Sequence, residues 1–217
     1  MEKIDTFYER LKGSYFIFLG ICFSLLFNTI AVILFRQVDP TFNMFSNFIS
    51  DLGDGPNNSN IVFNTGMIIS GIFSIFIFLY LMRFLQKKKG NSRIIFSAFI
   101  MGFIASIGAI MVGIFTVNTA PIMHVIGAAF SFFGNFFALI LFAKSEYSIS
   151  EISKKYSISG FILASVNFLY LTFFFLLYLN IGFSKELTIF TEWLAIFANI
   201  VWFFIQGVLI HLTATGD

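Results

Sequence analysis

Apolar residues occur along this chain in six long runs that short polar segments separate. The runs cover residues 14–35, 60–82, 94–116, 124–142, 158–181 and 187–210. Each is close to the length of about 20 residues that a helix needs to cross the hydrocarbon core of a bilayer. In lipid, every backbone amide must be paired within its own segment, and the runs lack the alternation of a barrel strand. We therefore expect an all-α polytopic membrane protein with a six-helix transmembrane bundle.

The composition agrees with a membrane environment. Hydrophobic residues make up 58% of the chain and charged residues 11%, whereas a soluble domain has about 25% charged residues. Since no stretch remains to build a soluble core, we expect residues 1–217 to form a single membrane domain. A net charge of +2 gives no indication of nucleic-acid binding. The expected partners are membrane lipids, with a membrane-protein partner or a second copy of this chain as an alternative.

Lysine and arginine indicate which way the helices cross the membrane, because cytoplasmic loops retain these residues. All of the 13 lysines and arginines except Arg36 and Lys185 fall in the amino-terminal tail, the second loop or the fourth loop. With an even number of spans, both termini lie on the same side. The sequence thus predicts a multi-pass protein of the cell membrane with cytoplasmic amino and carboxyl termini.

The longest connection, residues 37–59, carries apolar side chains at helical spacing. They recur every three or four residues, as Phe42, Phe45, Phe48, Ile49 and Leu52. Pro40 precedes them and Gly53 follows them, as is typical of a helix start and a helix end. We predict a short amphipathic interfacial helix in this first outer loop.

Small residues indicate where helices approach one another closely in a membrane. They are densest in the runs 60–82, 94–116 and 124–142, with pairs such as Gly102 with Ser106 and Gly134 with Ala138. We therefore expect the third and fourth spans at the centre of the bundle and the first and fifth in greater contact with lipid.

Several amides lie at membrane depth, where an amide that faces lipid is costly. They are Asn28, Asn64, Asn135, Asn167, Asn199 and Gln206. One interpretation is that these amides join helices through hydrogen bonds. The alternative is a pathway for a polar solute.

Three ionisable residues, Asp51, His124 and Glu192, lie near the outer ends of different helices. Two carboxylates and an imidazole suit a zinc site with one open position, or a general acid and base pair. They are the candidate catalytic and metal-binding residues. The structural alternative is that His124 caps a helix and that Glu192 interacts with the positive helix end. The sequence leaves the identity of any cofactor open.

The chain resembles domain-of-unknown-function family 998. The residues that carry the resemblance are Ser50 to Gly53, Asn64, Gly66, Gly71, Gly113 to Phe115, His124 and Glu192. That family comprises small six-span membrane proteins of bacteria and archaea, and its layout is distantly similar to the damage-regulated autophagy modulator group. The chain departs from the family pattern at Thr116, where a proline is expected. The resemblance implies a multi-pass membrane protein with a polar outer cluster and brings no established activity.

Three classes of function fit these observations. The favoured one is a membrane module that binds lipid or a partner through its phenylalanine-rich faces, since Phe occurs 34 times. The alternatives are a small-solute transporter or channel and an outer-face metal-dependent hydrolase that acts on lipid. The sequence lacks both a Gly-x-Ser-x-Gly elbow and a His-Glu-x-x-His pair. Whether the protein is an enzyme is left open.

Overall fold

The computed structural model describes residues 5–8 and 13–214. Its six membrane-length helices are α2 (Gly13–Arg36), α3 (Ser59–Lys87), α4 (Ser92–Ile114), α5 (Pro121–Ser148), α6 (Lys154–Tyr178) and α7 (Lys185–Ala214). Strands are absent from this part of the chain. The predicted all-α class and six-helix bundle are confirmed. The helices α3 and α5 continue beyond the predicted ends, to Lys87 and Ser148.

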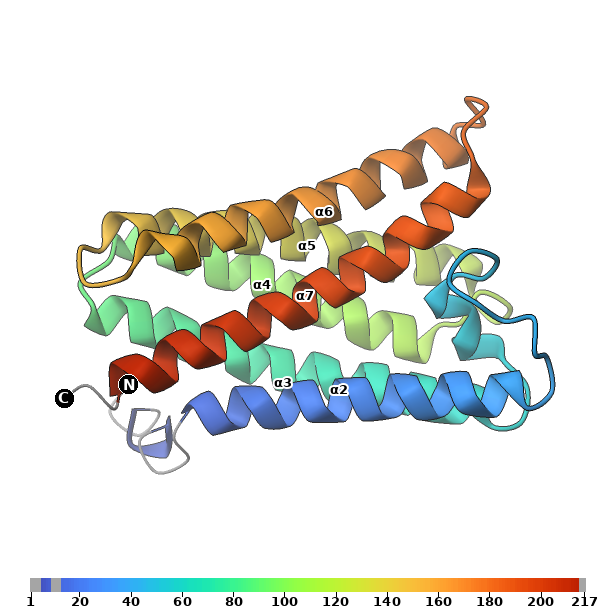
Figure 1. Ribbon diagram of the computed structural model, residues 1–217, viewed down its shortest axis with the longest axis horizontal. Coiled ribbons are helices and arrows are strands. Elements are labelled where there is room, and N and C mark those ends of the chain that lie inside the picture. Colours follow the sequence, from blue (N-terminus) through green and yellow to red (C-terminus); the bar gives the residue numbers. More distant parts are fainter. Residues whose placement is uncertain (1–4, 9–12, 215–217) are drawn as a thin grey trace.

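The helices alternate in direction and form a closed ring. Each packs against its neighbours in the sequence, and α7 closes the ring by packing against α2 (Figure 1). Of the six contacts in the ring, the one between α2 and α7 is the least extensive. Since the backbones surround the middle of the ring, side chains alone determine whether the interior is filled or hollow.

The connections gather at two ends of the ring (Figure 1). One end carries the start of α2, the α3–α4 and α5–α6 connections and the end of α7; we call it the basic end. The lysines and arginines at or near this end are Arg83, Lys87, Lys88, Lys89, Arg93, Lys144, Lys154 and Lys155. Arg36 and Lys185 lie at the opposite end, which we call the capped end. Lys3, Arg10 and Lys12 lie outside the described residues.

The helices α4 and α5 touch backbone to backbone. A Cβ atom at Gly108 would lie 2.3 Å from the backbone nitrogen of Ser131, and one at Gly134 would lie 2.6 Å from that of Ala105. This is the close approach that small residues allow. The spans of α2 and α6 are the least buried, as predicted, but the most buried span is that of α7. Sequence reasoning missed the position of α7 because its small residues are few.

The connection between α2 and α3 differs from the predicted surface helix. Turns lead into a 3-10 helix, η1 (Ile49–Asp54), and Phe42, Ile49 and Leu52 are buried. The ring centroid of Phe42 lies 4.3 Å from that of Phe35 and 6.2 Å from that of Trp193. Phe42, Ile49 and Leu52 of the predicted pattern therefore fill the capped end of the ring, whereas Phe45 is exposed, and only a short part of the loop is helical.

Candidate functional site

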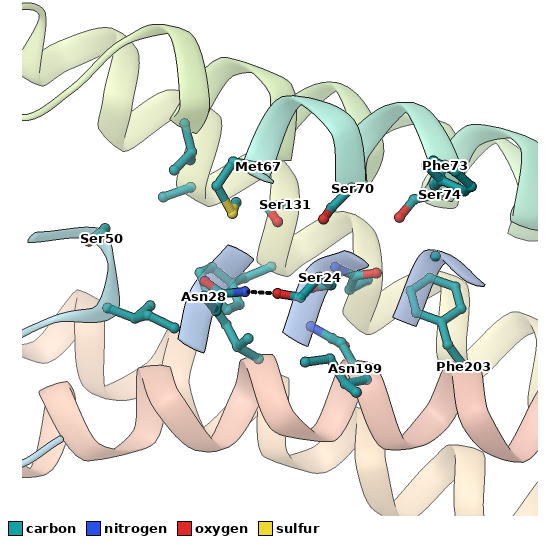
Figure 2. A pocket seen from close by; sticks show the side chains of 18 of the residues that line it. Ser24, Asn28, Ser50, Met67, Ser70, Phe73, Ser74, Ser131, Asn199 and Phe203 are labelled. Carbon is teal, nitrogen blue, oxygen red and sulfur yellow. Dashed lines mark hydrogen bonds between the residues drawn. The ribbon is translucent and has the colours of Figure 1, made fainter. Parts of the chain in front are cut away.

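A cavity of about 120 Å³ lies inside the ring, between α2, α3, α5 and α7, with η1 above it at the capped end. Its polar wall consists of Ser24, Asn28, Ser50, Ser70, Ser74, His124, Ser131, Asn135, Glu192 and Asn199. Figure 2 shows Ser70 and Ser74 on α3 and Ser131 on α5 lying across the cavity from Asn199 on α7. No lysine or arginine among the described residues lines it.

Four helical serines of the cavity wall lack the hydrogen bond that a serine inside a helix commonly makes. Elsewhere, the hydroxyls of Ser106 and Ser165 donate to carbonyl oxygens of their own helices at 2.8 and 2.6 Å. Within residues 5–8 and 13–214, no such partner exists for the hydroxyls of Ser24, Ser70, Ser74 and Ser131. A polar group away from bulk solvent is costly unless it is hydrogen-bonded. These hydroxyls therefore require water or a ligand.

Four of the intramembrane asparagines are hydrogen-bonded within the described chain, and one, Asn135, is not. Asn167 and Asn199 pair with each other, with Nδ2–Oδ1 distances of 3.0 and 3.2 Å, and so join α6 to α7. Asn64 donates from Nδ2 to the carbonyl oxygen of Gly53 at 3.0 Å and ties α3 to η1. Asn28 donates to the carbonyl oxygen of Ser24 at 2.8 Å (Figure 2). In the described part of the chain, the side chain of Asn135 has no partner and lines the cavity.

Gln206 lies outside the cavity wall, on the part of α7 nearer the basic end. It is buried and faces Glu146 of α5, which is also buried, and no basic residue is paired with this carboxyl group in the described chain. Sequence reasoning missed Glu146, because a glutamate two residues beyond Lys144 reads as part of a solvated loop. The continuation of α5 to Ser148 places it inside the bundle.

Glu192 ties η1 to α7. Its Oε2 atom accepts a hydrogen bond from the backbone N–H of Ile49 at 2.7 Å, and its Oε1 atom accepts one from the hydroxyl of Ser50 at 3.3 Å. The indole N–H of Trp193 donates to the carbonyl oxygen of Asn47 at 2.9 Å. Glu192 is 3% exposed and lines the cavity, and through these two hydrogen bonds it holds the segment that covers the cavity in place.

The other two candidate residues have different surroundings. Asp51 accepts the backbone N–H of Phe48 at 2.9 Å, and it does not line the cavity. Burial raises the pKa of the Asp51 carboxyl group, and the hydrogen bond from Phe48 opposes that rise. His124 lines the cavity, and its Nδ1 atom lies 2.8 Å from the carbonyl oxygen of Phe115. Because a carbonyl oxygen only accepts, Nδ1 carries the proton and Nε2 is the acceptor of the neutral ring.

The three candidates do not form one cluster. Within residues 5–8 and 13–214, no group of three or more His, Cys, Asp or Glu side chains has an arrangement that holds a metal ion. Glu192 and His124 share the cavity wall, whereas Asp51 lies in η1 and accepts the N–H of its N-cap residue, Phe48. A zinc or acid–base role for these residues stays a prediction, and their hydrogen bonds give it no support.

Comparison with known proteins places the chain in a family. The family described as "Protein of unknown function (DUF998)" matches residues 22–209. No curated protein and no solved structure matches the chain. The matched region contains η1, the whole of α3 to α6, most of α2 and α7, and every polar residue of the cavity wall. Because the match extends through all six helices, this membrane protein belongs to the DUF998 family.

Proposed function

We propose that this protein is a ligand-binding membrane protein whose binding site is the cavity inside the ring. The observation that carries the proposal is the set of unpaired serine hydroxyls, Ser24, Ser70, Ser74 and Ser131, which line one cavity. Several helical serines outside this space, such as Ser106 and Ser165, bond to carbonyl oxygens of their own helices. The cavity hydroxyls are therefore available to a ligand in surroundings where a hydrogen bond is strengthened by the low dielectric constant.

The size and the charge of the cavity define the ligand. Its volume of about 120 Å³ is similar to that of the engineered cavity of about 150 Å³ that holds benzene, so the bound group has about six non-hydrogen atoms. An anionic group would lie beside the Glu192 carboxyl group, and no lysine or arginine in the described chain lines the cavity to compensate it. Serine hydroxyls and the Asn135 amide suit an uncharged group that carries hydroxyls or amides.

Binding accounts for the site better than hydrolysis does. Both oxygen atoms of Glu192 accept hydrogen bonds from η1, and Nδ1 of His124 is held by Phe115. These bonds orient the side chains as parts of the wall. A binding role needs no further feature, because the unpaired hydroxyls already supply the recognition.

The proposal includes an orientation in the cell membrane. The basic end lies in the cytoplasm, because translocation of lysine- and arginine-rich loops is disfavoured. The capped end, with η1 above the cavity, then faces the outside, and both termini are cytoplasmic.

The proposal is tested by the compounds that co-purify with the protein. Wild-type protein, a Ser74→Leu/Asn135→Leu variant and a Ser165→Leu control are purified in parallel, and their bound compounds are quantified by mass spectrometry. Ser165 is exposed and bonded to its own helix, so the control makes the same type of change outside the cavity. The double variant loses at least two hydrogen bonds worth about 0.5–1.5 kcal/mol each, and we expect at least about a fivefold loss of one uncharged compound.

The control protein should retain that compound at the wild-type level. Gel filtration of all three proteins establishes that they are equally monodisperse. If the double variant is folded and its bound compounds equal those of the wild type, the cavity is not a binding site and the proposal is wrong.

A further inference from the structure

The ring has a groove on its outer wall between α2 and α7, the pair of neighbours with the least extensive contact. The groove has a volume of about 180 Å³. Leu25 and Ile33 of α2 and Phe197 of α7 line it and are exposed on the surface that faces lipid. Apart from Asn28 and Thr29, the side chains that line it are apolar.

The groove adjoins the cavity. Asn28, Ile49, Ile196 and Ile200 line both spaces, so the same side chains separate the apolar groove from the polar cavity. At the capped end, by contrast, η1 is held down by Glu192 and Asn64, and the preceding residue Asn47 by Trp193. The side that faces the bilayer is therefore the less obstructed way into the cavity.

We infer that the ligand is a neutral single-chain lipid that enters sideways from the bilayer between α2 and α7. Its hydroxylated headgroup occupies the cavity and its hydrocarbon chain lies in the groove. The inference rests on the proposed function of the cavity and adds the chemical class of the ligand. A monoacylglycerol has this form, because its glycerol head supplies hydroxyls to the serines and its chain supplies apolar surface to Ile196 and Ile200.

The charge of the headgroup sets the selectivity. In the described chain, neither the groove nor the cavity is lined by lysine or arginine, and Glu192 lies in the cavity wall. A phosphate would be placed near a carboxyl group without a cation to pair with, which is unfavourable away from water. We therefore expect monoacylglycerol to bind in preference to lysophosphatidylglycerol, whose chain is the same.

The protein contains a natural reporter for the chain. Trp193 lines the groove. The other tryptophan of the two, Trp202, is fully buried, and its ring centroid lies 5.9 Å from that of Phe142 and 6.0 Å from that of Phe78. In a Trp202→Phe variant, the emission comes from Trp193 alone. Bromine atoms on an acyl chain quench tryptophan emission on contact.

The experiment titrates Trp202→Phe protein in phosphatidylcholine nanodiscs with brominated monoacylglycerol or brominated lysophosphatidylglycerol. We expect saturable quenching by monoacylglycerol and an apparent affinity at least about tenfold lower for the phospholipid. Adding Thr29→Phe fills the groove and should abolish the saturable phase. Adding Ile30→Phe, a matched change at an exposed position outside the groove, should leave it unchanged.

Equal quenching by the two lipids, unchanged by Thr29→Phe, would show ordinary contact with bulk lipid and would overturn the inference. So would saturable quenching that persists with Ser74→Leu/Asn135→Leu, since the headgroup would then lie elsewhere. A different result is that the double variant loses a co-purified compound that has no hydrocarbon chain, while neither lipid quenches Trp193. That result would overturn the inference and leave the proposed function of the cavity intact. Native mass spectrometry of wild-type protein with the same lipids repeats the comparison without Trp202→Phe.

Discussion

Serine has two roles inside this bundle, and its hydrogen-bond partner distinguishes them. Ser157 is buried between helices, and its hydroxyl donates to the carbonyl oxygen of Ala143 at 2.6 Å, so it joins α6 to α5. Ser70 faces the cavity and has no partner in the described chain. A bonded serine contributes to the stability of the fold, whereas an unbonded one in a membrane interior reduces it unless a ligand is bound.

This difference predicts opposite effects of the same substitution. Ser157→Ala should lower the free energy of unfolding by about 0.5–1.5 kcal/mol, because one interhelical hydrogen bond is lost. Ser70→Ala should leave it unchanged or raise it, since a costly unpaired hydroxyl is removed. Unfolding titrations in mixed detergent micelles measure both values. A loss of stability in Ser70→Ala equal to that in Ser157→Ala would contradict the unpaired state of Ser70.

The Glu192 carboxyl group is predicted to be the main tie between α7 and the cover of the cavity. Glu192→Gln replaces one acceptor oxygen by an amide nitrogen, which meets the N–H of Ile49 or the hydroxyl of Ser50. Leaving a buried donor without its acceptor should lower the free energy of unfolding by about 1–3 kcal/mol. Protease cleavage within residues 41–48 should also increase in the Glu192→Gln variant.

Glu186→Gln serves as the control for this substitution, because Glu186 is exposed on the same helix. We expect a change below about 0.5 kcal/mol there. Equal behaviour of the two variants in the unfolding and protease assays would refute the anchoring role of Glu192.

At the scale of elements, the α4–α5 pair and η1 limit the space inside the ring. Glycines bring α4 and α5 into backbone contact, so no side chain fits between them. At the capped end, η1 fills the ring with Ile49 and Leu52. The cavity lies in the part of the ring interior that neither the α4–α5 contact nor η1 occupies.

Gly108 is the position at which this packing is most sensitive to substitution. A valine there would put its Cβ within 2.3 Å of the Ser131 backbone nitrogen and 2.5 Å of the Gly127 carbonyl oxygen. Because both atoms belong to a backbone, the helices must separate, and we expect a cost above about 3 kcal/mol. Ala109→Val, the neighbouring half-exposed position, should cost far less. Melting temperatures of the two purified variants provide the comparison, and equal values would exclude the close contact.

At the scale of the whole molecule, the ring has two chemically different ends. Lysines and arginines concentrate at the basic end, and the cavity with its cover lies towards the capped end. A lipid ligand taken from the bilayer therefore meets the cavity in the half of the membrane on the capped side. The orientation decides which leaflet supplies the ligand.

Single cysteines test the orientation in intact cells. In a Cys22→Ser background, which removes the one native cysteine, Asn118→Cys places a thiol at the capped end and Ser153→Cys places one at the basic end. Both positions are exposed. We expect a membrane-impermeant maleimide to label Asn118→Cys in intact cells and Ser153→Cys only after permeabilisation. The reverse pattern would invert the proposed topology.

Hydropathy and charge along the chain were sufficient to predict the six helices, the all-α class and the separation of the basic residues. These properties are local: a run of apolar residues in lipid must pair its amides within itself, whatever its neighbours do. The amide pair Asn167–Asn199 also follows one of the two interpretations of the polar residues. The surface helix was not realised, because Phe42, Ile49 and Leu52 pack inward and only residues 49–54 are helical.

The tertiary structure alone decided the rest. Ser50 and Glu192 meet although they are 142 positions apart, and Ser70 and Ser165 differ only in what surrounds them. No periodicity distinguishes a serine that bonds its own helix from one that faces a cavity, because that depends on how six helices close into a ring. Residue type and hydropathy therefore determined that the protein spans the membrane six times, and packing determined where a ligand has room to bind.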